Sequence, residues 1–293
     1  MQDRNENFVS IFPPHALLYQ ETVRRALLED LGNAGDITTD ALVSKDDKVT
    51  AKIVARASGR VAGLDVAACA FHCLDPNLIF ETHLSDGQDA RPGDTLAVIR
   101  GHARPILTAE RTALNFLMRL SGVATATRDM VKLISSYPAR IVCTRKTTPG
   151  LRALEKYAVR VGGGANHRFG LDDAILIKDN HIIVAGGVTE AIRRVQKCAG
   201  HLVKIEVEVD TLEQLEEALQ EGVDAILLDN MPIKMLAEAV QRAKGKAITE
   251  ASGGVTPENV CLIAATGVDL ISIGWITHST PALNLALELA VTA

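Results

Sequence analysis

The second half of the chain repeats one short pattern, in which an apolar stretch ends at a polar residue and a helix-forming segment follows. The apolar stretches are, in order, RIVCT, AILIK, VKIEVEV, AILLD, AITEA and DLISIG. Strands that alternate with helices predict a parallel sheet covered by helices. Polar residues near the strand ends, Glu208, Asp229, Glu250 and Ser272, are separated by 21, 21 and 22 positions. This even period favours a barrel, and six units instead of eight predict an open or incomplete, TIM-like α/β barrel.

The first part of the chain has a different character and predicts a separate domain. Residues 16–31 carry apolar side chains at helical spacing, and residues 49–100 contain short strand-like runs between turns. We therefore expect an N-terminal α+β, sandwich-like domain with a long linking helix over residues 1–120, and a barrel domain over residues 121–293.

Two helix positions belong to this expectation. Thr108 is a candidate N-cap for the linking helix, which would begin at Ala109, and a last helix from Ser279 would pack back on the N-terminal domain. Arg111 would then lie in the first turn of the linking helix, where a cation opposes the helix dipole. It is either an ordinary surface residue or a cation that serves an anion elsewhere, such as one across a subunit contact.

Composition argues against several classes of protein. The 293 residues carry a net charge of −5 and a pI of about 5.9, so nucleic-acid binding is not expected. The chain has neither an apolar run of about 18 residues nor a signal-peptide core, so we expect no membrane segment and a cytoplasmic location. The five cysteines lack metal-ligand spacing and are typical of core thiols in a reducing compartment.

Charge is concentrated where the repeat begins. From Arg140 to His181 the sequence holds eight Lys and Arg and four Asp and Glu, a local net of +4 (8 − 4). Such a field in an acidic protein indicates a small anionic ligand. The working residues of barrels lie at the carboxyl ends of strands, and here those ends carry cations, acids and glycines. They are Thr144, Arg145, Lys146, Lys178, Asp179, Asn180, Glu206, Glu208, Asp229, Asn230, Glu250, Ser252, Gly253, Gly254 and Gly274.

In the strand VKIEVEV, Glu206 and Glu208 share the face opposite to the apolar one, so both carboxylates should point into the barrel. Buried carboxylates are costly unless they are paired or bound to a cation. Two explanations stay open: an internal ion-pair network with Lys178 or Lys204, and a site for Mg²⁺, sugar hydroxyls or both.

The segment GGGANHRF, which starts at Gly162, resembles a phosphate loop but fits neither common glycine-rich motif. We interpret its glycines as turn residues. His167 and Arg168 follow them, and Arg145 lies on a neighbouring strand end, so two arginines could grip two carboxylates bidentately. A better phosphate loop is EASGGV, where N–H groups of residues 252–254 follow a strand and would open a helix, although a simple turn also explains it.

Longer motifs carry a family resemblance. TRKTTPGLRALEKYAVRVGGGANHRFGLDDAILIKDNHI, together with GDITTDAL, ERTALNFLMRLSGVAT, EVEVDTLEQ, LLDNM and EASGGV, closely resembles the quinolinate phosphoribosyltransferases over nearly the whole chain. Trp275 and Met118 depart from the pattern, which leads us to expect a small residue and a glutamine there. Trp275 follows a strand end and would narrow the phosphate side of the pocket.

The resemblance implies a reaction, a metal and an assembly. Quinolinate and phosphoribosyl pyrophosphate would give nicotinate mononucleotide, pyrophosphate and CO₂, with Mg²⁺, in NAD biosynthesis. The resemblance also implies a homodimer in which Arg111 reaches the neighbouring site, and it leaves a dimer-based hexamer open.

The resemblance also assigns roles to residues. Lys146, Glu208 and Asp229 would be catalytic, and the last two would hold the metal. Quinolinate would contact Arg111, Arg145, His167, Arg168 and Lys178. The phosphoribosyl substrate and its metal would be held by Lys146, Glu208, Asp229, Ser252, Gly253, Gly254 and Gly274, and His278 would lie near the phosphate. Thr144 and Ser272 would also bind substrate.

Two rival functions remain open at this point. One is a relative that transfers phosphoribosyl to another aromatic acid, or a transport-operon relative of unknown activity. The intact NHR and TRKT segments argue against it. The other is a non-catalytic sensor of small anions, which the presence of acids beside the bases at the strand ends disfavours.

Overall fold

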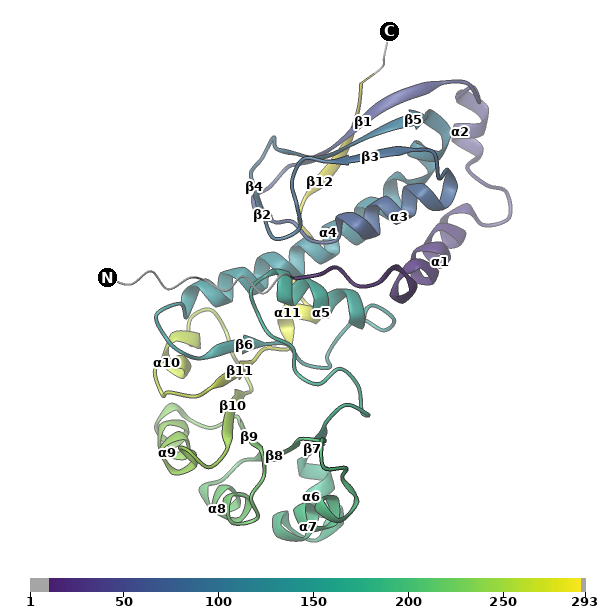
Figure 1. The fold of residues 1–293 in the computed structure, drawn as a ribbon. Coiled ribbons are helices and arrows are strands. Elements are labelled where there is room, and N and C mark those ends of the chain that lie inside the picture. The colour runs from purple at the N-terminus through teal and green to yellow at the C-terminus, as the bar shows by residue number, and fades with distance from the viewer. Residues whose placement is uncertain (1–10, 291–293) are drawn as a thin grey trace. The chain divides into compact units, whose positions relative to one another are not determined.

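The computed structural model describes residues 11–290, which divide into two compact units (Figure 1). Unit 1 holds the described residues up to Thr125, the segment Ala153–Val161 and the residues from Pro281 onward. Unit 2 holds Ala126–Arg152 and Gly162–Thr280. The chain therefore passes from one unit to the other more than once.

Unit 1 is built on a four-stranded antiparallel sheet with strand order β12-β1-β5-β3. A two-stranded ladder joins β2 to β4. The strands are β1 (Lys48–Ala55), β2 (Gly59–Arg60), β3 (Ile79–Thr82), β4 (Asp89–Ala90), β5 (Thr95–His102) and β12 (Leu285–Ala290). The helices are η1 (Ala16–Leu18), α1 (Gln20–Leu31), α2 (Ile37–Leu42), α3 (Leu64–Leu74), the long α4 (Ala103–Leu133), which continues into unit 2, and α5 (Arg152–Val161). The predicted N-terminal α+β domain is confirmed, and its main sheet is antiparallel.

The expected last helix from Ser279 is wrong. The chain forms strand β12 instead, and this strand pairs antiparallel with β1, with Ile53 opposite Leu287 (Figure 1). The segment LALELA is rich in helix formers, but its leucines also alternate with period two. Leu285 is 4% exposed, whereas Leu289 is 45% exposed. The open edge of β1 thus decides the conformation, because sheet pairing and burial override weak helix propensity.

The predicted start of the linking helix is also wrong. Helix α4 begins at Ala103, so Thr108 is an interior residue and not an N-cap. Its hydroxyl donates a hydrogen bond to the Asp36 carboxylate (3.0 Å), which itself caps α2 by accepting the N–H of Thr39 (2.9 Å). Arg111 consequently lies more than two turns inside α4, where the helix dipole no longer explains its position.

Unit 2 contains a six-stranded parallel sheet with strand order β6-β11-β10-β9-β8-β7. This order confirms an open, TIM-like barrel, because β6 and β7 lie at the two edges of the sheet. The strands are β6 (Arg140–Val142), β7 (Ile175–Ile177), β8 (Ile205–Val209), β9 (Ala225–Asp229), β10 (Ile248–Ser252) and β11 (Leu270–Ser272). The helices are α6 (Asp179–Ala185), α7 (Val188–Cys198), α8 (Leu212–Gln220), α9 (Ile233–Ala243), α10 (Val260–Ala264) and α11 (Trp275–His278).

One βα unit of the barrel is irregular. The helix that follows β6 is α5, and its residues from Ala153 onward belong to unit 1 and not to the barrel. Its carboxylate Glu155 is fully buried and accepts two hydrogen bonds from Arg119 of α4, at 2.8 and 3.1 Å. The local pattern predicts a helix here, but it does not predict which core that helix joins.

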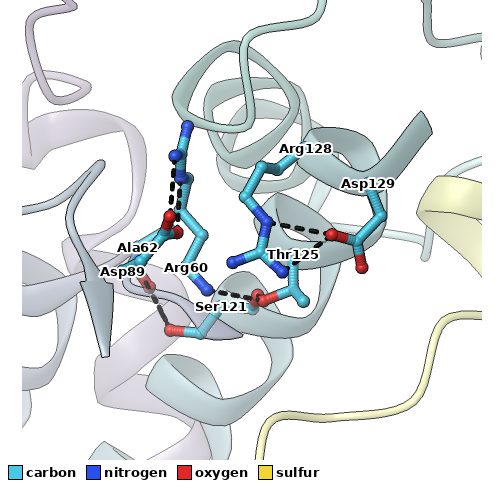
Figure 2. A network of polar contacts seen from close by, with 7 residues as sticks. All are labelled: Arg60, Ala62, Asp89, Ser121, Thr125, Arg128 and Asp129. Atoms are coloured by element: carbon cyan, nitrogen blue, oxygen red, sulfur yellow. Dashed lines mark hydrogen bonds and ion pairs between the residues drawn. The ribbon is translucent and has the colours of Figure 1, made fainter. Parts of the chain in front are cut away.

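Polar residues of α4 satisfy the irregular backbone around β2 (Figure 2). The buried hydroxyl of Ser121 accepts the N–H of Ala62 (3.1 Å) and donates to the same residue's carbonyl (3.3 Å). Thr125, four residues along the helix, accepts the N–H of Arg60 (2.8 Å). The Arg60 side chain pairs with Asp89 across the β2–β4 ladder. Figure 2 also draws the ion pair between the neighbouring residues Arg128 and Asp129 on α4. Buried backbone groups outside regular structure thus obtain partners from side chains.

Ser121→Ala should destabilise the protein by about 1–3 kcal/mol, because it leaves the buried N–H and carbonyl of Ala62 without this partner. Urea unfolding followed by circular dichroism measures the change. Asn115→Ala, at an exposed position of the same helix, is the control and should change stability by less than about 0.5 kcal/mol. Equal stabilities of the two variants would contradict the role given to Ser121.

Candidate active site

A cavity of about 550 Å³ opens at the carboxyl ends of the strands of unit 2. The parallel register brings these ends together, since Ser252 lies opposite Asp229 and Glu208 lies opposite Leu227. The lining residues are Thr144, Arg145, Lys146, His167, Arg168, Leu176, Lys178, Glu208, Leu227, Asp229, Asn230, Glu250, Ser252, Gly253, Gly254 and Ser272. A smaller cavity of about 180 Å³ shares part of this wall and adds Val255, Ile273, Gly274, Trp275 and His278. The volume of the larger cavity lies in the range that is common for small-molecule sites.

One side of the larger cavity carries two arginines with unmet hydrogen-bonding capacity. Nε of Arg145 and Nε of Arg168 are both buried and have no hydrogen-bond partner within the protein. Arg168 is held in place by a hydrogen bond from its Nη1 to the carbonyl of Ala174 (3.1 Å). Burial, and then the positive charge of Arg145, lower the pKa of Arg168. Two adjacent, partly desolvated guanidinium groups with free donors form a site for an anion with more than one acceptor.

The lining of the same cavity also includes carboxylates. Glu208 lies 3.5 Å from Nζ of Lys178 and shares the cavity wall with Asp229. Burial, and then the negative charge of Asp229, raise the pKa of Glu208, whereas Lys178 opposes the rise. Lys204 takes no part, because its ammonium pairs with Asp224. An ion pair with Lys178 therefore explains part of the environment of Glu208. The carboxylates of Glu208 and Asp229 still line the same cavity.

A buried cluster of His167, Glu206 and Glu250 borders the cavity, since His167 and Glu250 belong to its lining. Nε2 of His167 is 2.8 Å from Oε2 of Glu206 and 3.7 Å from Oε1 of Glu250. Nδ1 of His167 accepts the backbone N–H of Arg168 (2.7 Å), so the ring carries its proton on Nε2 and donates it to Glu206. Both ring nitrogens thus have protein partners, and direct contact with a ligand carboxylate would require one of them to be exchanged.

Glu250 is the acid of this cluster that the surroundings keep protonated. Its side chain is 2% exposed, and Oε1 has no hydrogen-bond partner. Burial, and then the charge of Glu206, raise the pKa of Glu250 to about 7. Ligand atoms of His167, Glu206 and Glu250 lie within 4.8 Å of one another, a set of donors that metals also use. The positive charges of the neighbouring arginines disfavour a metal ion beside this cluster. Protonation of Glu250 is a simpler way to reduce the repulsion between its carboxylate and that of Glu206.

The glycine loop after β10 differs in one respect from the expectation. Helix α10 begins only at Val260, so the N–H groups of residues 252–254 do not open a helix, and the argument from the helix dipole is wrong. The indole N–H of Trp275 donates to the carbonyl of Val255 (2.9 Å) at the edge of the smaller cavity. Trp275 thus ties the end of this loop to the end of β11 and forms part of the cavity wall.

The structure brings together most of the predicted site residues. All of them except Arg111 line one or both cavities, whereas Arg111 is an exposed residue of unit 1 that lines neither. The three glycines from Gly162 line neither cavity, and Gly163 has a φ of +90° just after α5, which fits a turn. Asn230 and Glu250 also line the larger cavity; both stand among the polar strand-end residues of the sequence, but the family resemblance assigned a role to neither. Glu206, another strand-end residue, lines neither cavity. The even spacing of polar strand ends marks Glu250, and Asn230 directly follows Asp229.

A further cavity of about 540 Å³ lies at the opposite, amino-terminal ends of β9 and β10. Its acids already have backbone partners: Asp224 accepts the N–H of Ile205 (2.9 Å), and Asp269 accepts the N–H of Thr249 (2.8 Å). These contacts hold neighbouring strands together. Residues at this end of a barrel generally serve stability, so this cavity is not the candidate site.

Glu250→Gln should change how stability depends on pH. The pKa of Glu250 is raised from its ordinary value of 4.5 to about 7, so between these values the folded protein holds a proton that the unfolded chain releases. Stability from this group is therefore lost as pH rises through that window, and glutamine removes the loss. Relative to wild type, the variant should gain on the order of 3 kcal/mol between about pH 4.5 and pH 8.

Urea unfolding of wild type and variant across this range measures the difference. Glu258→Gln is the matched control, because Glu258 is exposed and its hydrogen bond with Thr256 lowers its pKa, which gives a small dependence of opposite sign. A constant difference between Glu250→Gln and wild type at all pH values would show that folding does not raise the pKa of Glu250.

Comparison with known proteins identifies the family. Residues 36–121 match the family model of the quinolinate phosphoribosyl transferase N-terminal domain, and residues 123–288 match that of the C-terminal domain. A nicotinate-nucleotide pyrophosphorylase (carboxylating) of Mycobacterium leprae is 46% identical over 277 residues, which cover 92% of this chain and 96% of that protein. A probable enzyme of the same name from Bacillus subtilis is 42% identical over 276 residues, which cover 94% and 95%.

Solved structures agree with these matches. The nicotinate-nucleotide pyrophosphorylase of Francisella tularensis superposes with a TM-score of 0.91 at 40% identity, over 96% of this chain and 99% of that chain. The similarity extends through both units, and relatives of this identity share one family. The chain belongs to the quinolinate phosphoribosyltransferase family.

Proposed function

We infer that this chain is a carboxylating nicotinate-nucleotide pyrophosphorylase, a pentosyltransferase of NAD biosynthesis. It transfers phosphoribosyl from phosphoribosyl pyrophosphate to quinolinate and yields nicotinate mononucleotide, pyrophosphate and CO₂. Relatives of that name match the chain over most of its length. The observation within the site that carries this function is the pair of buried, unpartnered guanidinium nitrogens of Arg145 and Arg168.

The arginine side of the cavity suits the two carboxylates of quinolinate. Arg145 and Arg168 offer donors that no protein group satisfies, and a dicarboxylate supplies four acceptor oxygens. Lys178 borders the same space and adds a third positive charge. His167 adjoins these arginines: its Nε2 donates a hydrogen bond to Glu206, and its Nδ1 accepts the backbone N–H of Arg168. A monocarboxylate such as nicotinate would leave part of this cationic surface without a partner.

The acids Glu208 and Asp229, together with Lys146 and the loop of residues 252–254, suit the phosphoribosyl substrate and its metal. Lys146 and the loop of residues 252–254 border both cavities, which provides room for phosphates next to the larger cavity. We propose that Glu208 and Asp229 hold Mg²⁺ together with substrate oxygens, because burial, and then the charge of Asp229, raise the pKa of Glu208, and a divalent cation would stabilise both carboxylates in their ionised form. The ion would neutralise charge on the departing pyrophosphate.

Catalysis by these residues rests on position and charge. The pyridine nitrogen attacks the anomeric carbon of the ribose as the bond to pyrophosphate breaks, and positive charge develops on the sugar. Glu208 and Asp229 can stabilise that charge, and Lys146 can stabilise the leaving phosphates. When the adjacent carboxylate leaves as CO₂, its bonding electron pair stays on the ring carbon, where the positive charge of the now quaternary nitrogen stabilises it, and that carbon then takes up a proton. No side chain needs to act as a nucleophile.

We also propose a homodimer in which Arg111 enters the site of the partner subunit, with a dimer-based hexamer as the larger assembly. Arg111 is an exposed cation within α4 that lines neither of the two site cavities and that the helix dipole does not explain. A cytoplasmic location is likewise a proposal, supported by five free cysteines, two of which hold their sulfurs 4.0 Å apart without a disulfide. The described helices include none that could span a membrane.

Purified protein with quinolinate, phosphoribosyl pyrophosphate and Mg²⁺ should release CO₂ and form nicotinate mononucleotide, while nicotinate should not replace quinolinate.

Arg145→Ala or Arg168→Ala should weaken quinolinate binding more than about tenfold, because each removes a charge-assisted contact. Titration calorimetry measures the affinity, and Arg194→Ala, an exposed arginine of α7, is the control. Turnover of nicotinate without CO₂ release would favour a different phosphoribosyltransferase, and binding without any turnover would favour an anion sensor.

The proposal that Arg111 enters the site of the partner subunit is tested by mixing two inactive variants. Arg111→Ala and Lys146→Ala should each lose activity, and a mixture that has exchanged subunits should recover part of it, because one site of a mixed dimer then keeps both residues. Mass spectrometry of isotopically labelled subunits establishes that exchange has occurred. No recovery in a sample with proven mixed dimers would place Arg111 in its own subunit's site or in none.

A further inference from the structure

Asn230 has an unusual backbone conformation directly beside the cavity. Among the described residues 11–290 it is the non-glycine residue with a positive φ, at 51°. It follows Asp229 at the carboxyl end of β9 and lines the larger cavity. Asparagine tolerates the left-handed region better than most residues, yet the conformation still has an energetic cost. Such a conformation persists where surrounding contacts impose it, and it is frequent at functional sites.

Three contacts surround Asn230, and they join two strand ends. Its backbone N–H donates to the carbonyl of Ser252 on β10 (2.9 Å). Its side-chain Nδ2 donates to Oδ2 of Asp229 (2.6 Å). Its carboxamide oxygen occupies the space in which any side chain at Gly253 would begin, and Gly253 itself has a φ of +93°. One residue thus touches both the carboxylate at the end of β9 and the glycine loop after β10.

These contacts limit the freedom of two groups that face the cavity. The hydrogen bond to Oδ2 orients the Asp229 carboxylate and leaves Oδ1 available to a ligand. The close fit over Gly253 sets how near the loop can approach the end of β9, because a Cβ at that position would overlap the Asn230 side chain. The loop of residues 252–254 is therefore positioned by the same side chain that orients Asp229.

We propose that Asn230 is a positioning residue that holds the Asp229 carboxylate and the Ser252–Gly254 loop in a fixed relation, so that the ribose and phosphate groups of phosphoribosyl pyrophosphate meet one preformed surface. This inference rests on the proposed function, which places that substrate at Asp229 and the loop. The quinolinate side lies on other strands, so Asn230 affects one substrate and not the other.

An ordinary turn residue would give different results from a positioning residue. Asn230→Gly keeps the positive φ without strain but removes both the amide donor and the contact with Gly253. Asn230→Asp keeps the size and still tolerates the left-handed region, but it places an oxygen against the Asp229 carboxylate. If Asn230 only makes the turn, the glycine variant should bind substrates as the wild type does. If it positions the two groups, both variants should lose affinity.

The experiment measures binding of phosphoribosyl pyrophosphate, inorganic pyrophosphate and quinolinate separately by titration calorimetry, with and without Mg²⁺. We expect Asn230→Gly and Asn230→Asp to weaken phosphoribosyl pyrophosphate binding about tenfold or more, because the oriented acceptor and the loop are lost together. Quinolinate affinity should stay within about twofold, since its contacts are unchanged. Steady-state kinetics should show a raised KM for phosphoribosyl pyrophosphate.

Asn77→Gly, at an exposed turn of unit 1, is the matched control and should behave as wild type. Thermal unfolding identifies a variant that fails to fold, and the other variant then decides the outcome. Wild-type affinity for phosphoribosyl pyrophosphate in the folded Asn230→Gly or Asn230→Asp protein, or an equal loss for quinolinate, overturns the inference. If the wild type itself does not bind phosphoribosyl pyrophosphate, the proposed function fails instead.

Discussion

The parallel register of β8, β9 and β10 is the constraint on which the candidate active site depends. It aligns the carboxyl ends of the strands, so that Asp229 lies opposite Ser252 and both border the same cavity as Glu208. Apolar residues of β8 hold the register by packing in the core, because Ile205, Val207 and Val209 are all buried. A shift of one residue would turn the two glutamates of that strand away from the cavity and toward the helices.

Charge balance within the cavity follows from this alignment. Cations from the ends of β6 and β7 and from the loop between α5 and β7 face acids from β8, β9 and β10. The arginines keep unmet donors for a ligand, whereas His167 and Glu206 satisfy each other beneath them. Burial, and then the charge of Glu206, raise the pKa of Glu250 to about 7, which favours its protonated form below neutral pH. Protonation of this carboxyl group reduces the negative charge that the buried cluster places next to the arginines.

Local sequence patterns predicted most elements, but they placed the start of one helix too late and predicted a helix where the C-terminal strand forms. Thr108 looks like an N-cap because a good helix follows it, yet the helix extends back to Ala103 and the hydroxyl serves the Asp36 carboxylate instead. The C-terminal segment has helix-forming residues, yet it completes the sheet of unit 1 beside β1. In both cases a partner distant in the sequence decides the outcome, and propensity within a short window contains no information on that partner.

The sequence by itself determined the alternation of strands and helices, the acids and bases at the strand ends, and the motifs that place the chain in its family. These features are local, since apolar periodicity and strand-ending residues follow directly from the order of amino acids. Only the tertiary structure decided that His167 faces Glu206, that Glu250 is buried without a partner for Oε1, and that Asn230 adopts a left-handed conformation against Gly253. These contacts join residues of different strands and loops, so they exist only when the register of the sheet is set.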